Sequence, residues 1–442
     1  MNVNFILLMI SAIIFFGFLS EFISKKTKIP NILALILLGF FIGPYGLKYI
    51  NLESISPFVP LFTTFTLIFI LFDGAFSLDI KSMIKELPYS LLVTIVNFFV
   101  SSLIIAVILL FFGFSISISI MTGFMLGGIS SSFVIPLLKG FDIKKNSYSL
   151  LTLESALTDI LCIVFTIAMI EFIKLQSFNI SNIVIRIISL FGMAGFVGIS
   201  GGIIWIVLVS NFFKEHKTYM DTIAFLILIY VVTEYLHGNG ALAALFFGIM
   251  LKNSKLITSF IKNEDIHFGV SVTKPSEKVF FDQITFFIKT FFFVYIGALF
   301  DISNIQALVI GTIISVSLMI VRNVSSSILI NLKEQEKSLL NSVFGRGIAA
   351  AVLAQIAIEM NVPYALLIEK VVYVVIVETI VLSSIRVFIT RKMERRKEEK
   401  TFKLAEVKKN YNSSKDKSKD KSVLIDKKVK TKHRKIKNKS NK

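Results

Sequence analysis

The stretch LTLESALTDILCIVF, residues 151–165, decides the fold, because it sets Glu154 and Asp159 inside an apolar segment that extends over residues 147–173. A helix of about 20 mainly apolar residues crosses the ~30 Å hydrocarbon core of a bilayer. An ionisable side chain within such a helix is costly and usually faces the bundle interior or a water-filled cavity. The stretch therefore predicts a membrane-spanning helix that carries a polar site.

The composition of the whole chain is that of a membrane protein. Of its 442 residues, 55% are hydrophobic, and the mean hydropathy is +0.78. Soluble domains are roughly 45–50% apolar. We predict an all-α integral membrane protein with about thirteen transmembrane helices. The predicted segments are residues 4–22, 31–50, 57–78, 88–113, 116–138, 147–173, 182–212, 218–236, 238–252, 280–300, 305–328, 338–359 and 363–389.

Basic residues gather in alternate loops between these segments. The loops after odd-numbered segments are basic, as at Lys25 and Lys26, whereas the loops after even-numbered segments, such as residues 301–304 and 361–363, carry few positive charges. Because positively charged loops stay on the cytoplasmic side, the alternation predicts a multi-pass protein of the cell membrane. Its N-terminus should lie outside and its C-terminus in the cytoplasm.

The positive charge of the chain is concentrated in its last part. Residues 391–442 contain 22 Lys and Arg against 7 Asp and Glu, a net +15 of the total +18. We therefore predict a transmembrane domain over residues 1–390 and a basic, disordered cytoplasmic tail over residues 391–442, which cannot bury enough apolar surface to fold. Such a tail beside an apolar body favours contact with anionic lipid, or simple solvation, over binding of nucleic acid.

Asp159 is the strongest candidate for the functional site. If its helix enters the membrane near Ser147, Asp159 lies about 18 Å along it, close to the midplane. Ser155 is four residues earlier on the same face, so the hydroxyl and the carboxylate can present oxygens to one small cation. Thr158 can add an oxygen from the neighbouring face. The alternative is that Asp159 forms a buried structural ion pair.

Two further ionisable residues fall within predicted spans. Asp73, in FILFDGAFSLD, can approach the Asp159 site from a neighbouring helix, or it can be an interfacial carboxylate. Lys289 lies roughly 14 Å into its span if that span starts near Phe280. This is too deep for Lys289 to extend easily to water, so it needs a carboxylate or a helix C-terminus as partner.

Two segments combine glycine, serine or proline in a way that interrupts a helix. LGGISSSFVIPLL, residues 126–138, contains Ser130 and Ser131, and SVFGRGIAAAVLAQ, residues 342–355, contains Arg346. Irregular backbone at membrane depth is tolerated where it lines a protein cavity, so the freed carbonyls and the serine hydroxyls are expected to face an ion path. The alternative for both is close helix packing through small residues.

Other buried charges call for partners within the bundle. Arg346 and Glu154 are predicted to form an ion pair, because a buried guanidinium cannot escape its charge by deprotonation. Glu369 is expected to pair locally with Lys370. Glu378, in the same segment, has no role that the sequence indicates.

These stretches together resemble a known family, the monovalent cation:proton antiporters, in particular the NhaP-type sodium/proton exchangers of archaea and bacteria. The similarity covers about residues 10–390. The matching stretches, in the family's order, are LFDGAFSLD, GGISSSFVIPLL, ESALTDI, GNGALAALFFGIMLKN, FFFVYIGALFD and GRGIAAAVLA.

The resemblance implies a homodimer in which each protomer has inverted repeats and two discontinuous helices that cross. It implies that Asp159 binds the cation and the proton alternately, with Ser155 and Asp73 as further sodium ligands, and that Glu154 and Arg346 stabilise the site. The chain departs from the family at Thr158, where the family has Asn. It also departs at the serine run, which replaces Thr-Asp-Pro, and at Asp73, which replaces Glu. The single aspartate resembles the branch that exchanges one proton per cation.

We therefore expect a secondary transporter that exchanges sodium, or lithium, for protons by alternating access, without a cofactor. A potassium/proton antiporter is the first alternative. A passive cation channel can also use broken helices, but it has no need of a titrating aspartate with Lys289 and Arg346 nearby. An enzyme is disfavoured, because the sequence shows no nucleophile paired with a base and no metal-ligand motif, and it contains only four histidines.

Overall fold

The computed structural model describes residues 3–27, 30–49, 58–76, 80–139, 145–175, 180–211, 219–262, 275–328 and 334–393, and its regular elements within these ranges are all helical. The labelled helices are α1 (Val3–Thr27), α2 (Asn31–Ile42), α4 (Val59–Phe76), α5 (Ile80–Phe111), α6 (Ile116–Leu126), α7 (Ser131–Lys139), α8 (Lys145–Leu175), α9 (Ile180–Asn211), α10 (Tyr219–Tyr235), α11 (Gly240–Lys252), α12 (Ser254–Lys262), α13 (Pro275–Leu299), α14 (Ile305–Ile328), α15 (Glu334–Ser342) and α16 (Ile348–Glu359). A last helix covers residues 365–393.

Every one of the thirteen predicted segments contains a helix, and the prediction of an all-helical membrane protein is confirmed. Within the described residues, seven segments are long and apolar enough to cross a membrane, and α2, α4, α11 and α16 are shorter apolar helices. The sequence missed α12. The two spans in which it predicted an interruption, residues 116–138 and 338–359, are divided in the structure into α6 with α7 and α15 with α16.

The chain divides into two compact units, Met1–Arg386 and Val387–Lys442. Of the second unit the structure describes residues 387–393, all of them helical. The predicted tail lies outside the described residues from position 394 onward.

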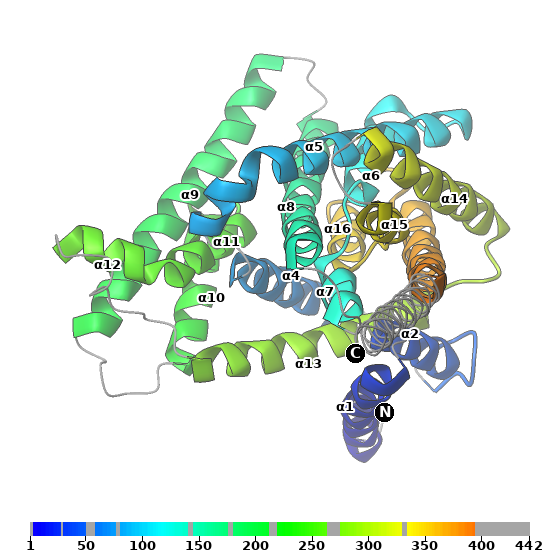
Figure 1. Ribbon diagram of the computed structural model, residues 1–442, viewed down its shortest axis with the longest axis horizontal. Coiled ribbons are helices and arrows are strands. Elements are labelled where there is room, and N and C mark those ends of the chain that lie inside the picture. The colour runs from blue at the N-terminus through cyan, green and yellow to red at the C-terminus, as the bar shows by residue number, and fades with distance from the viewer. Residues whose placement is uncertain are drawn as a thin grey trace, which may run out of the picture. The chain divides into compact units, whose positions relative to one another are not determined.

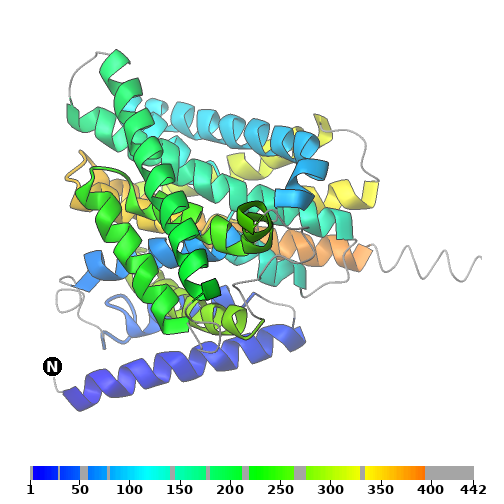
Figure 2. The same ribbon diagram turned by 90° about the vertical axis from the view of Figure 1, so that its left-hand side faces the viewer.

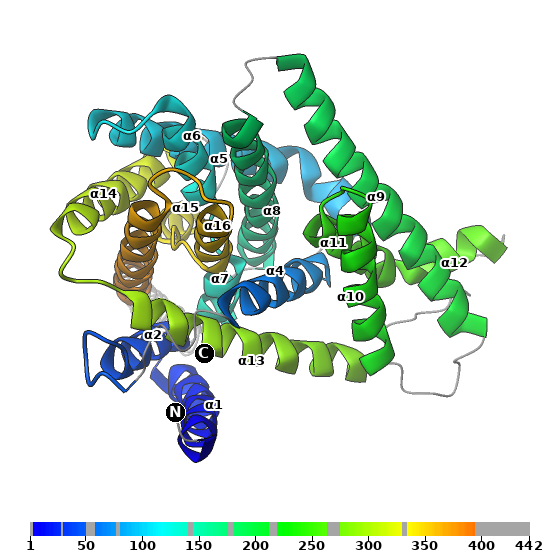
Figure 3. The ribbon, with the colours of Figure 1, turned by 180° about the vertical axis from the view of Figure 1, so that it is seen from behind.

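Figures 1 and 3, seen from opposite sides, place α9, α10 and α12 on one flank and α14 on the other, with α7, α8, α15 and α16 between them. Helix α8 contacts both α7 and α16. Helix α1 lies at the edge of the bundle (Figure 2) and packs against α2 and α13. Its exposed face carries Leu7, Phe15 and Phe18, as expected for a surface in contact with lipid.

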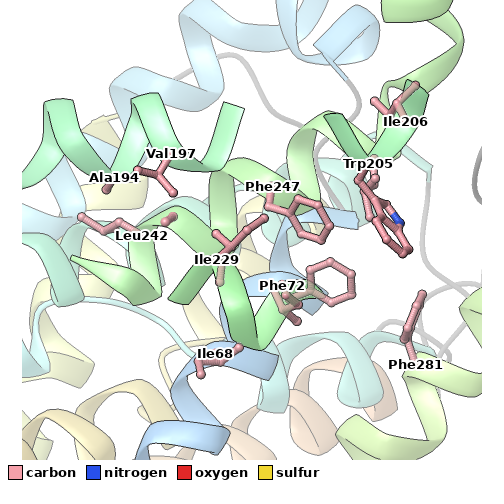
Figure 4. Close-up of a cluster of buried hydrophobic side chains, with 14 residues drawn as sticks. Ile68, Phe72, Ala194, Val197, Trp205, Ile206, Ile229, Leu242, Phe247 and Phe281 are labelled. Atoms are coloured by element: carbon pink, nitrogen blue, oxygen red, sulfur yellow. The ribbon is translucent and has the colours of Figure 1, made fainter. Parts of the chain in front are cut away.

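An aromatic cluster holds α9, α10 and α11 to α4 and α13 (Figure 4). The Phe72 ring stacks on Phe247 with centroids 6.1 Å apart, and it meets the edge of Phe281 at 5.3 Å. Trp205 stacks on Phe225 at 4.7 Å. Because Phe72 immediately precedes Asp73, this packing fixes the position of the predicted carboxylate on α4.

Helices α2 and α13 approach each other through glycines. A Cβ atom added at Gly39 would lie 1.9 Å from the Val294 carbonyl oxygen, and one added at Gly297 would lie 2.1 Å from the Ile36 oxygen. Only residues without a side chain allow two helix backbones to come so close, which is the usual packing solution within a membrane. The contact holds α13, and therefore Lys289, against the α2 side of the bundle.

Candidate functional site

The first predicted break in a helix lies between α6 and α7. Residues 127–130 are not helical, and α8 supplies the hydrogen bonds that they lose. The amide of Ile129 donates to Thr158 Oγ1 at 3.0 Å, and the Thr158 hydroxyl in turn donates to the Ile129 carbonyl at 3.2 Å. A Cβ atom at Gly128 would lie 2.6 Å from Cys162 Sγ and 2.9 Å from the Thr158 carbonyl oxygen. The absence of a side chain at Gly128 therefore lets the break touch α8.

The second break lies between α15 and α16, over residues 343–347. The last helix satisfies its backbone, because the amide of Arg346 donates to Thr379 Oγ1 at 3.0 Å and the amide of Phe344 donates to Ser383 Oγ at 3.3 Å. The two breaks meet directly: the amide of Ser130 donates to the Gly345 carbonyl at 3.0 Å. Residues more than 200 positions apart are thus joined by irregular backbone at the centre of the bundle.

Asp159 lies on α8 beside this meeting point, with only 7% of its surface exposed. The Ser131 hydroxyl donates to Asp159 Oδ2 at 2.6 Å, and the Ser131 amide donates to the same oxygen at 3.2 Å. Ser131 is the first residue of α7, so the carboxylate also faces the positive end of that helix. Oxygen Oδ1 receives neither hydrogen bond from Ser131.

The other predicted ligands on α8 and in the first break have different surroundings. Ser155 is buried one turn before Asp159, and its hydroxyl donates to the Thr152 carbonyl at 3.0 Å, which leaves its lone pairs as acceptors. The Thr158 hydroxyl is engaged with the backbone of Ile129, so its observed contact is with the break. Ser130 joins the break to Gly345 through its amide, and its carbonyl accepts from the amide of Val134 at 2.9 Å.

Asp73 and Lys289 form an ion pair between α4 and α13, with Lys289 Nζ 2.9 Å from Asp73 Oδ2. Their side chains are 30% and 24% exposed, so the pair is only partly withdrawn from the surface. Lys289 also interacts electrostatically with Asp159. Asp73 is therefore the carboxylate partner that was predicted for Lys289 from its depth in the membrane. The charge of Lys289 acts on both Asp73 and Asp159.

The predicted pairing of Glu154 with Arg346 is wrong, because Arg322 of α14 takes that place. Arg322 Nη1 donates to Glu154 Oε1, and Nη2 donates to Oε2 at 2.9 Å, which makes a two-pronged pair. Both side chains are almost fully buried, and Asn97 Nδ2 donates to Oε1 at 3.0 Å. Sequence reasoning missed Arg322 although the signal was present, since an arginine inside the segment 305–328 meets the rule that drew attention to Arg346.

Arg346 itself is buried in the second break, with 2% of its surface exposed. Its Nη1 donates to the Phe344 carbonyl at 3.3 Å, and among the described residues its Nε has no hydrogen-bond partner. It interacts electrostatically with Glu154, but the hydrogen bonds of that carboxylate go to Arg322 and Asn97. Arg346 therefore places a positive charge at the meeting of the two breaks.

The expected local pair of Glu369 and Lys370 is also wrong. Lys370 Nζ lies 2.9 Å from Asp301 Oδ2, and Glu369 is hydrogen-bonded by Gln355 of α16. Adjacent residues on a helix point about 100° apart, so the two side chains leave the helix in different directions.

Glu378 accepts a 2.7 Å hydrogen bond from the Thr312 hydroxyl of α14. Among the described residues no group of three His, Cys, Asp or Glu side chains is arranged to hold a metal ion.

Comparison with known proteins identifies the family and the fold. The family model described as "Sodium/hydrogen exchanger, transmembrane" matches residues 10–392. Na(+)/H(+) antiporter 1 of Methanocaldococcus jannaschii is 26% identical over 305 residues, which are 66% of this chain and 67% of that protein. The Na(+)/H(+) antiporter ApNhaP of Aphanothece halophytica is 25% identical over 336 residues, which are 73% of this chain but 60% of that protein.

The solved structure of the sodium proton antiporter MjNhaP1 from Methanocaldococcus jannaschii at pH 8 has the same fold. It superposes with a TM-score of 0.69 over 87% of this chain and 100% of the solved one, at 21% sequence identity. Since the family model covers most of the sequence, the chain belongs to the sodium/hydrogen exchanger family, a family of membrane transporters and not of enzymes.

Proposed function

We propose that this protein is an NhaP-type antiporter that exchanges sodium for protons at a single site centred on Asp159. The observation that carries the proposal is the position of this buried carboxylate, which sits where two interrupted helices meet and is held through Oδ2 by Ser131. A cation bound there can be surrounded by oxygens from Asp159, the Ser155 hydroxyl and freed carbonyls of the first break. Sodium is bound by such oxygen ligands, and a proton competes for the same carboxylate.

The exchange follows from this competition. A protonated Asp159 is neutral and cannot balance the charge of a cation, whereas the carboxylate can hold one. Each transport step therefore carries either the proton or the cation, and one aspartate gives one proton per cation. Asp73 is proposed to add a ligand when its pair with Lys289 opens, and Lys289 lowers the cost of a charged Asp159 while no cation is bound.

Alternating access then requires the site to face each side in turn. We propose thirteen spans with the N-terminus outside, in which α6 with α7 and α15 with α16 are the corresponding broken helices of two inverted repeats. The group of α7, α8, α15 and α16 is proposed to move against the group of α9, α10 and α11 within a homodimer. The tail is proposed to meet anionic lipid on the cytoplasmic side.

The test is cation-driven pH change inside proteoliposomes, with sodium, lithium and potassium in turn. Wild-type protein should show saturable exchange, and Asp159→Asn should abolish it for every cation. Asp221→Asn is a matched control, because Asp221 is an exposed acid in the first turn of α10, and it should exchange like the wild type. If potassium alone drives the pH change, the protein is a potassium/proton antiporter. Cation flux that persists in Asp159→Asn without coupled proton movement would replace the antiporter by a channel.

A further inference from the structure

A second buried carboxylate, Glu369, lies in a polar cluster that the transport site does not use. Gln355 Nε2 donates to Glu369 Oε1 and also to the Tyr373 hydroxyl oxygen, the latter at 2.7 Å. The Tyr373 hydroxyl is in turn hydrogen-bonded to Glu369. Exposure is 7% for Glu369, 5% for Gln355 and 1% for Tyr373. The hydrogen-bond partners of this buried acid are therefore an amide and a phenol, both neutral.

The adjacent lysine is engaged elsewhere. Lys370 Nζ binds Asp301 Oδ2 at 2.9 Å, and Asp301 also accepts the Ser303 hydroxyl at 2.6 Å. Burial of an acid without a paired cation is expensive, and the cost falls when the acid takes up a proton. Among the residues that the structure describes, Glu369 forms no ion pair, so it can change its protonation state without breaking one.

Titratable groups face the cluster from each helix around it. Tyr295 of α13 interacts electrostatically with Glu369 and with Glu359 at the end of α16. On its own helix Glu369 faces Tyr373, and Lys370, which binds Asp301, acts on it only through its charge. The phenol groups can pass or hold a proton, and Glu359 is exposed. Tyr295 thus lies within the electrostatic influence of both the buried acid and the exposed one.

The cluster lies further along α16 than the second break. Gln355 is eight residues beyond Gly347, the position of the second break, and so lies about 12 Å along α16. Helix α16 packs against α8, which carries Asp159. In the proposed orientation α16 runs from the midplane to the outer surface, so the cluster is between Asp159 and the outside. Asp73 is near the opposite, inner end of α4, and its partner Lys289 lies in the middle part of α13.

We infer that Glu369 is the proton carrier on the outer side of the membrane, an inference that rests on the proposed antiport at Asp159. When the site opens outward, the O–H bond of protonated Asp159 breaks and its proton passes through water to the carboxylate of Glu369. An O–H bond forms there and then breaks again as the proton leaves for the outer solution. The reverse sequence loads Asp159 from outside. Gln355 and Tyr373 orient the carboxylate, and no electron or other group is transferred.

The test compares two exchange modes of the same protein in proteoliposomes. Proton-coupled exchange is measured as sodium-driven pH change while the outer pH is varied at fixed inner pH. Sodium/sodium exchange, measured with radioactive sodium, moves no net proton. Glu369→Gln keeps nearly the same shape and an acceptor oxygen for Gln355, but it cannot carry a proton. We expect it to slow proton-coupled exchange by about 100-fold or more, to flatten its dependence on outer pH, and to leave sodium/sodium exchange unchanged.

Two further variants sharpen this test. Glu378→Gln removes an acid from the same helix that is bonded to Thr312, and it should behave like the wild type. Tyr373→Phe leaves Glu369 titratable but removes one hydrogen bond, so it should shift the outer-pH profile while coupling persists. If Glu369→Gln does not fold, the outer-pH profile of Tyr373→Phe tests the inference in its place.

The possible outcomes separate the inference from the proposed function. Equal loss of both exchange modes in Glu369→Gln would make the residue structural and overturn the inference. So would an unchanged profile in Glu369→Gln or, should that variant not fold, in Tyr373→Phe. In either case the proposed antiport stands if the wild type exchanges sodium for protons and Asp159→Asn does not. Absence of exchange in the wild type would instead remove the proposed function itself.

Discussion

Ser131 and Asp159 are 28 residues apart in the sequence, yet the Ser131 hydroxyl lies 2.6 Å from Asp159 Oδ2. The contact exists because α7 begins at Ser131, directly after the first break, and presents its amide and its hydroxyl to the same oxygen. Of the three serines at positions 130–132, Ser131 is therefore the one that is hydrogen-bonded to Asp159. It stabilises the charged form of the carboxylate, which is the form that a cation needs.

Removal of the Ser131 hydroxyl should weaken cation binding. Hydrogen bonds to charged groups contribute about 1.5–3 kcal/mol, so Ser131→Ala should raise the sodium concentration for half-maximal exchange by about 10- to 100-fold. Because protons then compete better, the activity profile should move to more alkaline pH. Initial rates of exchange at several pH values measure both effects. Ser132→Ala makes the same chemical change at the next residue and should have little effect; equal effects of the two variants would contradict the assignment.

The Glu154 and Arg322 pair should support the fold more than Arg346 does. Breaking a buried ion pair by removing one partner costs roughly 3–5 kcal/mol, since the other charge is left uncompensated. Arg322→Gln should therefore lower the thermal unfolding temperature in detergent strongly, and Arg346→Gln should lower it less. The double variant Glu154→Gln with Arg322→Gln should recover part of the loss. A larger loss in Arg346→Gln than in Arg322→Gln would restore the pairing expected from the sequence.

Lys289 should compete with the transported cation. Its pair with Asp73 is partly exposed, and such pairs contribute about 0.2–1 kcal/mol, so Lys289→Gln should tighten sodium binding by at most about fivefold. The additional change Asp73→Asn should cancel that gain, because the released carboxylate is its source. Concentration dependence of the initial exchange rate measures this. Lys370→Gln breaks another lysine–aspartate pair, far along the chain from Asp73, and should leave sodium binding unaltered.

The loop between α13 and α14 should make a contribution to stability that depends on pH. Burial by itself raises the pKa of Asp301, but hydrogen bonds from Lys370, Ser303 and Tyr45 outweigh it and hold that pKa well below its usual range. A carboxylate with a lowered pKa stabilises the folded state above its unfolded value of about 3.9, and this stabilisation is lost as the pH falls toward the folded value.

Asp301→Asn should therefore unfold at a lower temperature than the wild type between pH 6 and pH 8, by a similar margin throughout. The margin should shrink only below about pH 4, where the unfolded carboxyl takes up its proton. Thermal unfolding in detergent across this pH range is the measurement. A margin that already disappears near pH 6 would show that Asp301 is not held in its charged form by these partners.

Local composition determined the helices, the two interruptions and the central acid. Apolar runs of membrane length can form only helices in a bundle of this kind, because every backbone group must be satisfied within the segment. Gly127, Gly128 and the serine run mark a break wherever they occur in such a run. Asp159 was identifiable because a carboxylate in an apolar run is costly anywhere in the membrane. None of these inferences needs knowledge of which helices are neighbours.

Tertiary structure alone decided the partners of the charges. Glu154 has two arginines near it, and sequence offered no reason to prefer Arg322 of α14 over Arg346 of the second break. Glu369 likewise bonds Gln355 of another helix, while the adjacent Lys370 turns to Asp301. The physical reason is that an ion pair depends on distances of a few ångströms between side chains on different helices. Those distances are set by helix packing, which no stretch of sequence specifies by itself.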